Sequence, residues 1–160
     1  MDIVGCDGVT ITNSYIDASD DDICLGSHDA KSSCKRILIQ NCTIRSSANG
    51  IKFGTASRGG FSKIKILKNK VFDTYRSAIT LAAADGAYIE VDSLQAFNTG
   101  NAIFLRIGER IAGKKGRMEN LRISNVHVEI PATKPDAMIS NVTLTNIEIK
   151  YPGGGNPFFA

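Results

Sequence analysis

Three consecutive aspartates, Asp20, Asp21 and Asp22, run directly into a short apolar pattern in the segment SDDDICLGS. Carboxylates this close repel one another, so in a folded protein they are usually hydrated, bind a cation or take part in acid/base chemistry. Acid/base chemistry needs one carboxyl group that holds a proton and another that is ionised, and repulsion separates neighbouring pKa values in that way. The elements around the triplet decide which use applies.

An internal repeat surrounds the triplet. Alternating apolar residues that end in a polar residue occupy segments 9–16, 37–44 and 64–71, with weaker copies around residues 93, 125 and 146. Ten positions after the polar residue, four copies have an isoleucine that opens a second strand. The pairs are Asn13 with Ile23, Asn41 with Ile51, Asn69 with Ile79, and Ser93 with Ile103. These isoleucines are 28, 28 and 24 residues apart, which is the period of a solenoid.

The repeat predicts an all-β, right-handed parallel β-helix with two strands per coil and about five to six coils. We expect one partial β-helix domain over residues 1–160, with regular coils at 9–108. An irregular loop and the last strands follow at 109–150, and a glycine-rich tail at 151–160. The acid triplet therefore lies in the first regular coil.

Equivalent residues of successive coils should form columns about 4.8 Å apart along the stack. Because side chains alternate along a strand, we expect Ile23 and Leu25 to point inward, and Asp20, Asp22 and Cys24 to point outward. Asp21, at the start of the strand, can turn either way. We expect the corner asparagines to form a hydrogen-bonded ladder inside the coil. The two columns nearest the acids are Asp21, Asn49, Ser77, Asn101 and Cys24, Lys52, Thr80, Phe104.

Composition limits the class of partner. The chain has 160 residues, 42% of them hydrophobic and 22% charged, which is enough apolar sequence for one globular core. Its net charge of +3 comes from basic residues scattered through loops rather than gathered in a stripe, which argues against nucleic acid and suits an anionic polymer. The sequence contains neither a run of about 18 apolar residues nor a signal-peptide pattern. We expect no membrane partner.

The four cysteines are Cys6, Cys24, Cys34 and Cys42. They lack the paired close spacing of a zinc site, so we predict no metal. Buried thiols and disulfides both remain open, with Cys24 the most exposed candidate for a disulfide.

Segments 7–16, 19–21 and 46–55 resemble the central coils of the polygalacturonase-type glycoside hydrolases, glycoside hydrolase family 28. The resemblance covers about residues 2–130 and implies a right-handed parallel β-helix that hydrolyses pectin-like polysaccharide with inversion. In that family, Asn-Thr-Asp, Gly-Asp-Asp, Gly-His-Gly and Arg-Ile-Lys motifs follow one another on successive coils.

The aspartates of Gly-Asp-Asp match Asp20 and Asp21, with Ser19 in place of the glycine. The resemblance implies that Asp20 is the general acid and that Asp21 belongs to the base that activates water. Asp22 is an additional acid and a further candidate for the base. The Asn-Thr-Asp motif would fall just before Met1, so we expect an N-terminally truncated fragment that is inactive or impaired.

Two other family motifs are altered. Asn49 stands where the family has its histidine, and an amide cannot shuttle a proton. Residues 80–82 read Thr-Leu-Ala where the family has Arg-Ile-Lys. The candidate substrate-binding residues are therefore Asn49 and the cations Lys52, Arg76 and Arg106, which position alone suggests.

The leading hypothesis is a polygalacturonase-type glycosidase that acts without a cofactor, as a monomer, on an anionic pectin-like polysaccharide. Its parent protein would be extracellular or periplasmic. One alternative is a β-helical polysaccharide lyase, which would use calcium and a basic residue. Another is a non-catalytic carbohydrate-binding or structural solenoid. For the triplet itself, a calcium site or a solvated acidic edge stays open.

Overall fold

The computed structural model describes residues 1–82, 86–106, 117–129 and 142–144. Within these ranges the chain is all-β and contains no helix. The strands are β1 (Asp2–Val4), β2 (Asp7–Thr12), β3 (Tyr15–Ala18), β4 (Ile23–Ser27), β5 (Cys34–Gln40), β6 (Thr43–Ser46), β7 (Asn49–Ser57), β8 (Phe61–Leu67), β9 (Lys70–Ala82), β10 (Gly86–Arg106), β11 (Met118–Glu129) and β12 (Val142–Leu144).

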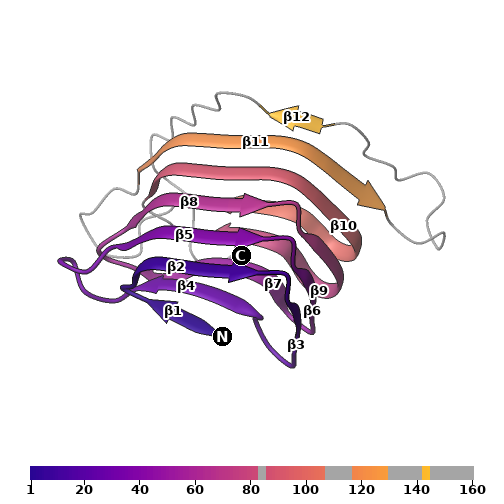
Figure 1. The fold of residues 1–160 in the computed structure, drawn as a ribbon, viewed down its shortest axis with the longest axis horizontal. Coiled ribbons are helices and arrows are strands. Elements are labelled where there is room, and N and C mark those ends of the chain that lie inside the picture. The colour runs from indigo at the N-terminus through magenta and orange to yellow at the C-terminus, as the bar shows by residue number, and fades with distance from the viewer. Residues whose placement is uncertain (83–85, 107–116, 130–141, 145–160) are drawn as a thin grey trace, which may run out of the picture.

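The strands stack in parallel as a β-solenoid, which confirms the predicted fold class (Figure 1). Face one contains β2, β5, β8, the first part of β10 and β11. Face two contains β3, β6 and the parts of β9, β10 and β11 that follow the first corner. Face three contains β1, β4, β7 and the ends of β9 and β10. The described coils therefore have three faces each. The first two coils have a separate strand on each face, whereas β9 spans two faces and β10 spans all three, so the prediction of two strands in every coil is wrong.

The predicted isoleucine column is present on face three. Ile23 pairs with Ile51, Ile51 with Ile79, and Ile79 with Ile103. The first three side chains have no exposed surface, and Ile103 is half-buried. The column forms because an isoleucine recurs at the same inward strand position in each coil, where its branched side chain packs on the one below.

The corner between faces one and two is built by residues with left-handed backbone conformation. Asn13, Asn41, Lys68, Ser93 and Asn125 occupy it, with φ between 52° and 55°. Asparagine tolerates this region better than most residues because its short polar side chain bonds locally. The Asn41 Nδ2 donates to the Asn13 Oδ1 at 2.6 Å.

Two details of the predicted ladder differ. The Asn13–Asn41 bond lies on the exposed side of the corner rather than inside the coil. In the third coil Lys68, not Asn69, takes the left-handed position. The side chain of Asn69 is buried instead, where its Nδ2 donates to the Ile39 carbonyl at 3.0 Å and its Oδ1 accepts from the Cys42 amide at 2.9 Å. Asn69 thereby links the second coil to the third.

Gly50 allows neighbouring coils to approach closely at the start of face three. A Cβ at this position would lie 2.6 Å from the Val71 Cγ1 and 2.8 Å from the Ala78 carbonyl oxygen. No larger residue fits there without displacing the stack.

Near the C-terminus, β12 pairs with β11 in the antiparallel sense. Most of the irregular loop and last strands predicted at 109–150, and the whole tail at 151–160, lie outside the described residues. The right-handed sense and the number of coils stay predictions.

Candidate functional site

The acid triplet lies in the turn between β3 and β4, at the N-terminal end of face three. The next coil holds the backbone of this turn. The Ser46 Oγ donates to the Asp20 carbonyl at 2.6 Å, and the Ser47 Oγ donates to the Ser19 carbonyl. The Asp22 amide donates to the Asn49 carbonyl at 3.0 Å. The three carboxyl groups therefore leave a fixed backbone in different directions.

Asp21 forms a partly buried ion pair with Lys52 from the next coil. The Lys52 Nζ lies 2.5 Å from the Asp21 Oδ2, and the two side chains are 21% and 10% exposed. The Asp21 Oδ1 accepts from the Asn49 Nδ2 at 2.6 Å and from the Asn49 amide at 3.2 Å. Burial raises the pKa of Asp21, but the bonds from Lys52 and Asn49 outweigh it, so the pKa lies below its ordinary value. Asp21 is therefore ionised at neutral pH.

Asn49 is buried and serves Asp21 rather than solvent. Its side chain is 3% exposed, and its Oδ1 accepts from the Thr80 Oγ1 at 2.7 Å. The amide thus has both ends bonded, one to Asp21 and one to Thr80. The predicted contact of Asn49 with substrate is not available in this arrangement, because the side chain lies beneath the surface. Its role here is to orient the Asp21 carboxylate.

Asp22 points inward, and the prediction that it points outward is wrong. Its side chain has no exposed surface, and neither carboxyl oxygen accepts a hydrogen bond of good geometry from a group in the described ranges. Burial, and secondarily the Asp17 carboxylate, raise the pKa of Asp22 to about 7. The N-terminal ammonium and the Ala18 amide only partly offset the effect of burial on its pKa. The alternation rule fails because Asp22 belongs to the turn and not to β4. A polysaccharide on the surface cannot touch this carboxyl group.

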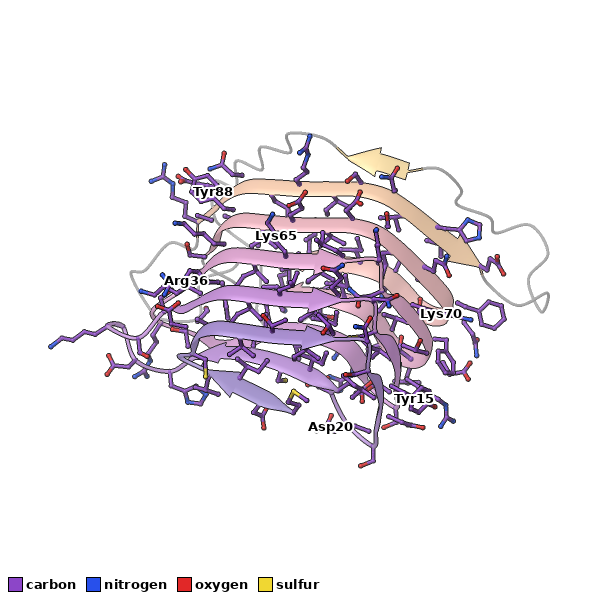
Figure 2. All side chains as sticks on the ribbon, in the orientation of Figure 1. Tyr15, Asp20, Arg36, Lys65, Lys70 and Tyr88 are labelled. Atoms are coloured by element: carbon purple, nitrogen blue, oxygen red, sulfur yellow. The ribbon has the colours of Figure 1, made fainter. Side chains whose placement is uncertain are left out.

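Asp20 is the exposed member of the triplet. Figure 2 shows it beside the turn at the N-terminal end of the stack. Its carbonyl is held by Ser46, while its side chain faces solvent. Asp20 and Asp21 are thus adjacent in the chain, one accessible and one clamped.

Of the predicted cations, Lys52 and Arg106 lie on face three, and Arg76 lies at the corner that precedes it. Lys52 stands in register between Cys24 and Thr80, as the predicted column requires. Arg76, in β9, and Arg106, at the end of β10, are exposed. The structure brings Lys52 into contact with the acids, while Arg76 and Arg106 belong to later coils of the stack.

Cys24 completes the surroundings of Asp21. Its Sγ lies 3.7 Å from the Asp21 Oδ2. Burial, with the nearby Asp21 charge, raises the pKa of the Cys24 thiol to about 11. The thiol therefore stays neutral and acts as a weak donor to Asp21, not as a nucleophile.

Sequence reasoning missed the supporting role of Ser46, Ser47 and Thr80. The predicted column contains Thr80 next to Lys52, but the bond from Thr80 to Asn49 depends on the direction of the threonine side chain. Ser46 ends β6 and Ser47 follows it, and nothing in their spacing indicates that they hold the turn one coil below. Within the described residues, no group of three or more acidic, histidine or cysteine side chains is arranged to hold a metal ion.

Comparison with known proteins finds no significant match among protein-family models, curated proteins or solved structures. The part of the chain that the structure describes also has no helix that could span a membrane.

Proposed function

We propose that this chain belongs to a polygalacturonase-type glycoside hydrolase that cleaves a pectin-like polysaccharide by inversion. One observation carries the proposal. At a single turn, the Asp21 carboxylate is kept ionised by Lys52 and Asn49, while the adjacent Asp20 carboxyl group is open to solvent. Inversion needs a carboxylate that activates water and an accessible acid that protonates the leaving oxygen. Asp21 and Asp20 suit these two roles.

Lys52 connects substrate charge to the base. Both Asp21 oxygens already accept hydrogen bonds, so a catalytic water needs one of them to be released. A uronate carboxylate at this face offers Lys52 a second anion, and a lysine ammonium on its long stem can turn to it. The Asp21 Oδ2 then becomes available to accept a proton from water. Binding of an anionic substrate thereby frees the base that activates water. Asp22 takes no part in this reaction.

The same bonds favour a second candidate, a carbohydrate-binding solenoid without catalysis. If Lys52 never leaves Asp21, the carboxylate is saturated and serves only to hold face three in shape. Binding would then use the exposed cations Arg76 and Arg106.

The test uses the protein expressed from its natural reading frame, with any residues encoded upstream of Met1. Hydrolysis of polygalacturonate is followed as new reducing ends. Asp20→Asn should lower turnover by about 10²- to 10⁴-fold and leave binding intact, because the amide keeps the shape and loses the proton. Asp7→Asn is the matched control, since Asp7 is an exposed, ion-paired acid on face one.

Each other outcome selects a different function. Full activity in Asp20→Asn, together with loss of activity on chelation, would mean that the triplet is a metal site and that the glycosidase proposal is wrong. Products that absorb ultraviolet light as unsaturated uronides would indicate a lyase. Binding of polygalacturonate without turnover by the wild type would support the carbohydrate-binding solenoid.

A further inference from the structure

Cys6 and Cys34 occupy equivalent places in two successive coils. Asp7 pairs with Lys35, and the Lys35 amide donates to the Cys6 carbonyl at 2.9 Å. The cysteines come one residue earlier in each strand, so they are neighbours across the stack. Cys34 has no exposed surface, and Cys6 is partly buried against the same core. Both side chains therefore lie on the inner side of face one.

Their sulfur atoms contact the same short segment. The Cys34 Sγ lies 3.7 Å from the Ile3 carbonyl oxygen, and the Cys6 Sγ lies 3.4 Å from the Val4 carbonyl oxygen. Neighbouring parallel strands are about 4.8 Å apart, which falls within the Cα separations of about 4.4–6.8 Å that disulfides span. Cys6 also precedes β2 and follows Gly5, whose φ is 57°. Because Cys6 lies outside β2, its side chain can rotate toward Cys34 while its carbonyl keeps the bond from the Lys35 amide.

The other two cysteines have no such neighbour. Cys24 pairs in register with Asp2 on one side and Lys52 on the other. Cys42 is fully buried, its amide bonds the Asn69 Oδ1, and its Sγ lies 3.7 Å from the Ile11 carbonyl oxygen. Among the four cysteines, stacking brings only Cys6 and Cys34 together.

We propose that Cys6 and Cys34 are a site of covalent modification, at which a small-molecule disulfide oxidises them to an intramolecular disulfide. The half-buried Cys6 thiolate attacks the oxidant, forms a mixed disulfide and releases one small thiol. Burial raises the pKa of the Cys34 thiol, so Cys34 gives up its proton to the departing thiolate as its sulfur attacks the Cys6 sulfur and releases the second small thiol. Two protein thiols and one small disulfide thus become one protein disulfide and two small thiols.

The bond would join the coil that carries the acid triplet to the next one. A cross-link restricts the unfolded chain, so the oxidised protein should unfold at a higher denaturant concentration than the reduced form. The proposal does not depend on the glycosidase assignment, since neither cysteine contacts Asp20 or Asp21 through any bond described above.

The experiment treats the folded protein with oxidised glutathione, blocks remaining thiols after unfolding, and maps peptides without reduction. Cleavage before aspartates and after lysines and arginines places the four cysteines in separate peptides. The expected result is a Cys6–Cys34 linkage, with Cys24 and Cys42 blocked as thiols. The unfolding midpoint should fall to that of the untreated protein when a reductant is added.

Two variants make the result specific. Cys34→Ser should stop at a stable glutathione adduct on Cys6, while Cys24→Ser should form the linkage like the wild type. The proposal would be overturned if wild-type Cys6 kept its glutathione adduct, stayed reduced, or joined another cysteine.

Discussion

At the scale of single residues, the Asp21–Lys52 pair is the main electrostatic feature of the site. It is mostly removed from water, and Asn49 bonds the carboxylate from a second direction. Partly buried ion pairs of this kind add little to folding stability when compared with apolar residues in the same place. Removing one partner is nevertheless costly, because it leaves an uncompensated charge. Stability and pKa should therefore both respond to loss of Lys52.

Lys52→Met should lower the free energy of unfolding by about 1–3 kcal/mol at neutral pH, because Asp21 stays buried and loses its cation. The matched control is Lys65→Met, whose ion pair with Glu90 is longer at 3.7 Å and whose side chain is 60% exposed. That exposed pair should contribute less than about 1 kcal/mol. Urea unfolding of both variants measures the difference, and equal losses would contradict the importance of the pair.

Asp22 should make the protein less stable as pH rises. Its folded pKa of about 7 lies above the ordinary value of 3.8, so between these values the folded state keeps a proton that the unfolded chain has released. The loss of folding stability is absent below the pKa of the unfolded chain, grows between the two pKa values and is complete above the pKa of the folded state. It amounts to about 2–4 kcal/mol.

Urea unfolding at several pH values between about 4 and 8 tests this, since the slope reports proton linkage. Asp22→Asn should flatten the dependence because the amide does not titrate. Asp29→Asn is the control, since Asp29 is exposed. An unchanged slope in Asp22→Asn would show that Asp22 does not hold the proton.

At the scale of elements, the corners turn face one into face two without long loops. Each corner uses one left-handed residue, and the first two are asparagines that bond each other. The corner between face one and face two is therefore specified by backbone conformation more than by burial.

Asn41→Ala should destabilise the protein by about 1–2 kcal/mol, because alanine resists a left-handed conformation and the bond to Asn13 is lost. Asn41→Gly should cost less, because glycine accepts that conformation. Asn101 is an exposed asparagine outside the left-handed set, so glycine there should cost more than alanine. Thermal unfolding of the four variants shows, at each of the two positions, whether alanine or glycine is more destabilising. If the same residue were more destabilising at both positions, the conformational explanation would be contradicted.

At the scale of the whole molecule, the described strands β1, β2 and β3 each have a partner on one side only, namely β4, β5 and β6. Such edges present unpaired backbone groups that template pairing with another chain. The isolated chain of 160 residues should therefore self-associate in a concentration-dependent way.

A lysine on the edge should weaken this association, because charges on edge strands oppose pairing. Thr12→Lys places the charge on β2, and Gln95→Lys places the same charge on β10, which has neighbours on both sides. Sedimentation velocity should show less association for Thr12→Lys than for Gln95→Lys. Equal effects would mean that added charge, and not the edge, controls association.

Regular repetition is what the sequence by itself determined. The ten-residue interval placed Ile23, Ile51, Ile79 and Ile103 in one column and Lys52 between Cys24 and Thr80, because equal chain lengths return equivalent residues to the same face. The tertiary structure decided what happens at the corners. Asp22 points inward because strand alternation does not extend into a turn. Lys68, and not Asn69, takes the left-handed position in the third coil because backbone conformation, and not residue type, determines which residue forms the corner. The bonds that clamp Asp21 likewise come from another coil, at contacts that no local pattern encodes.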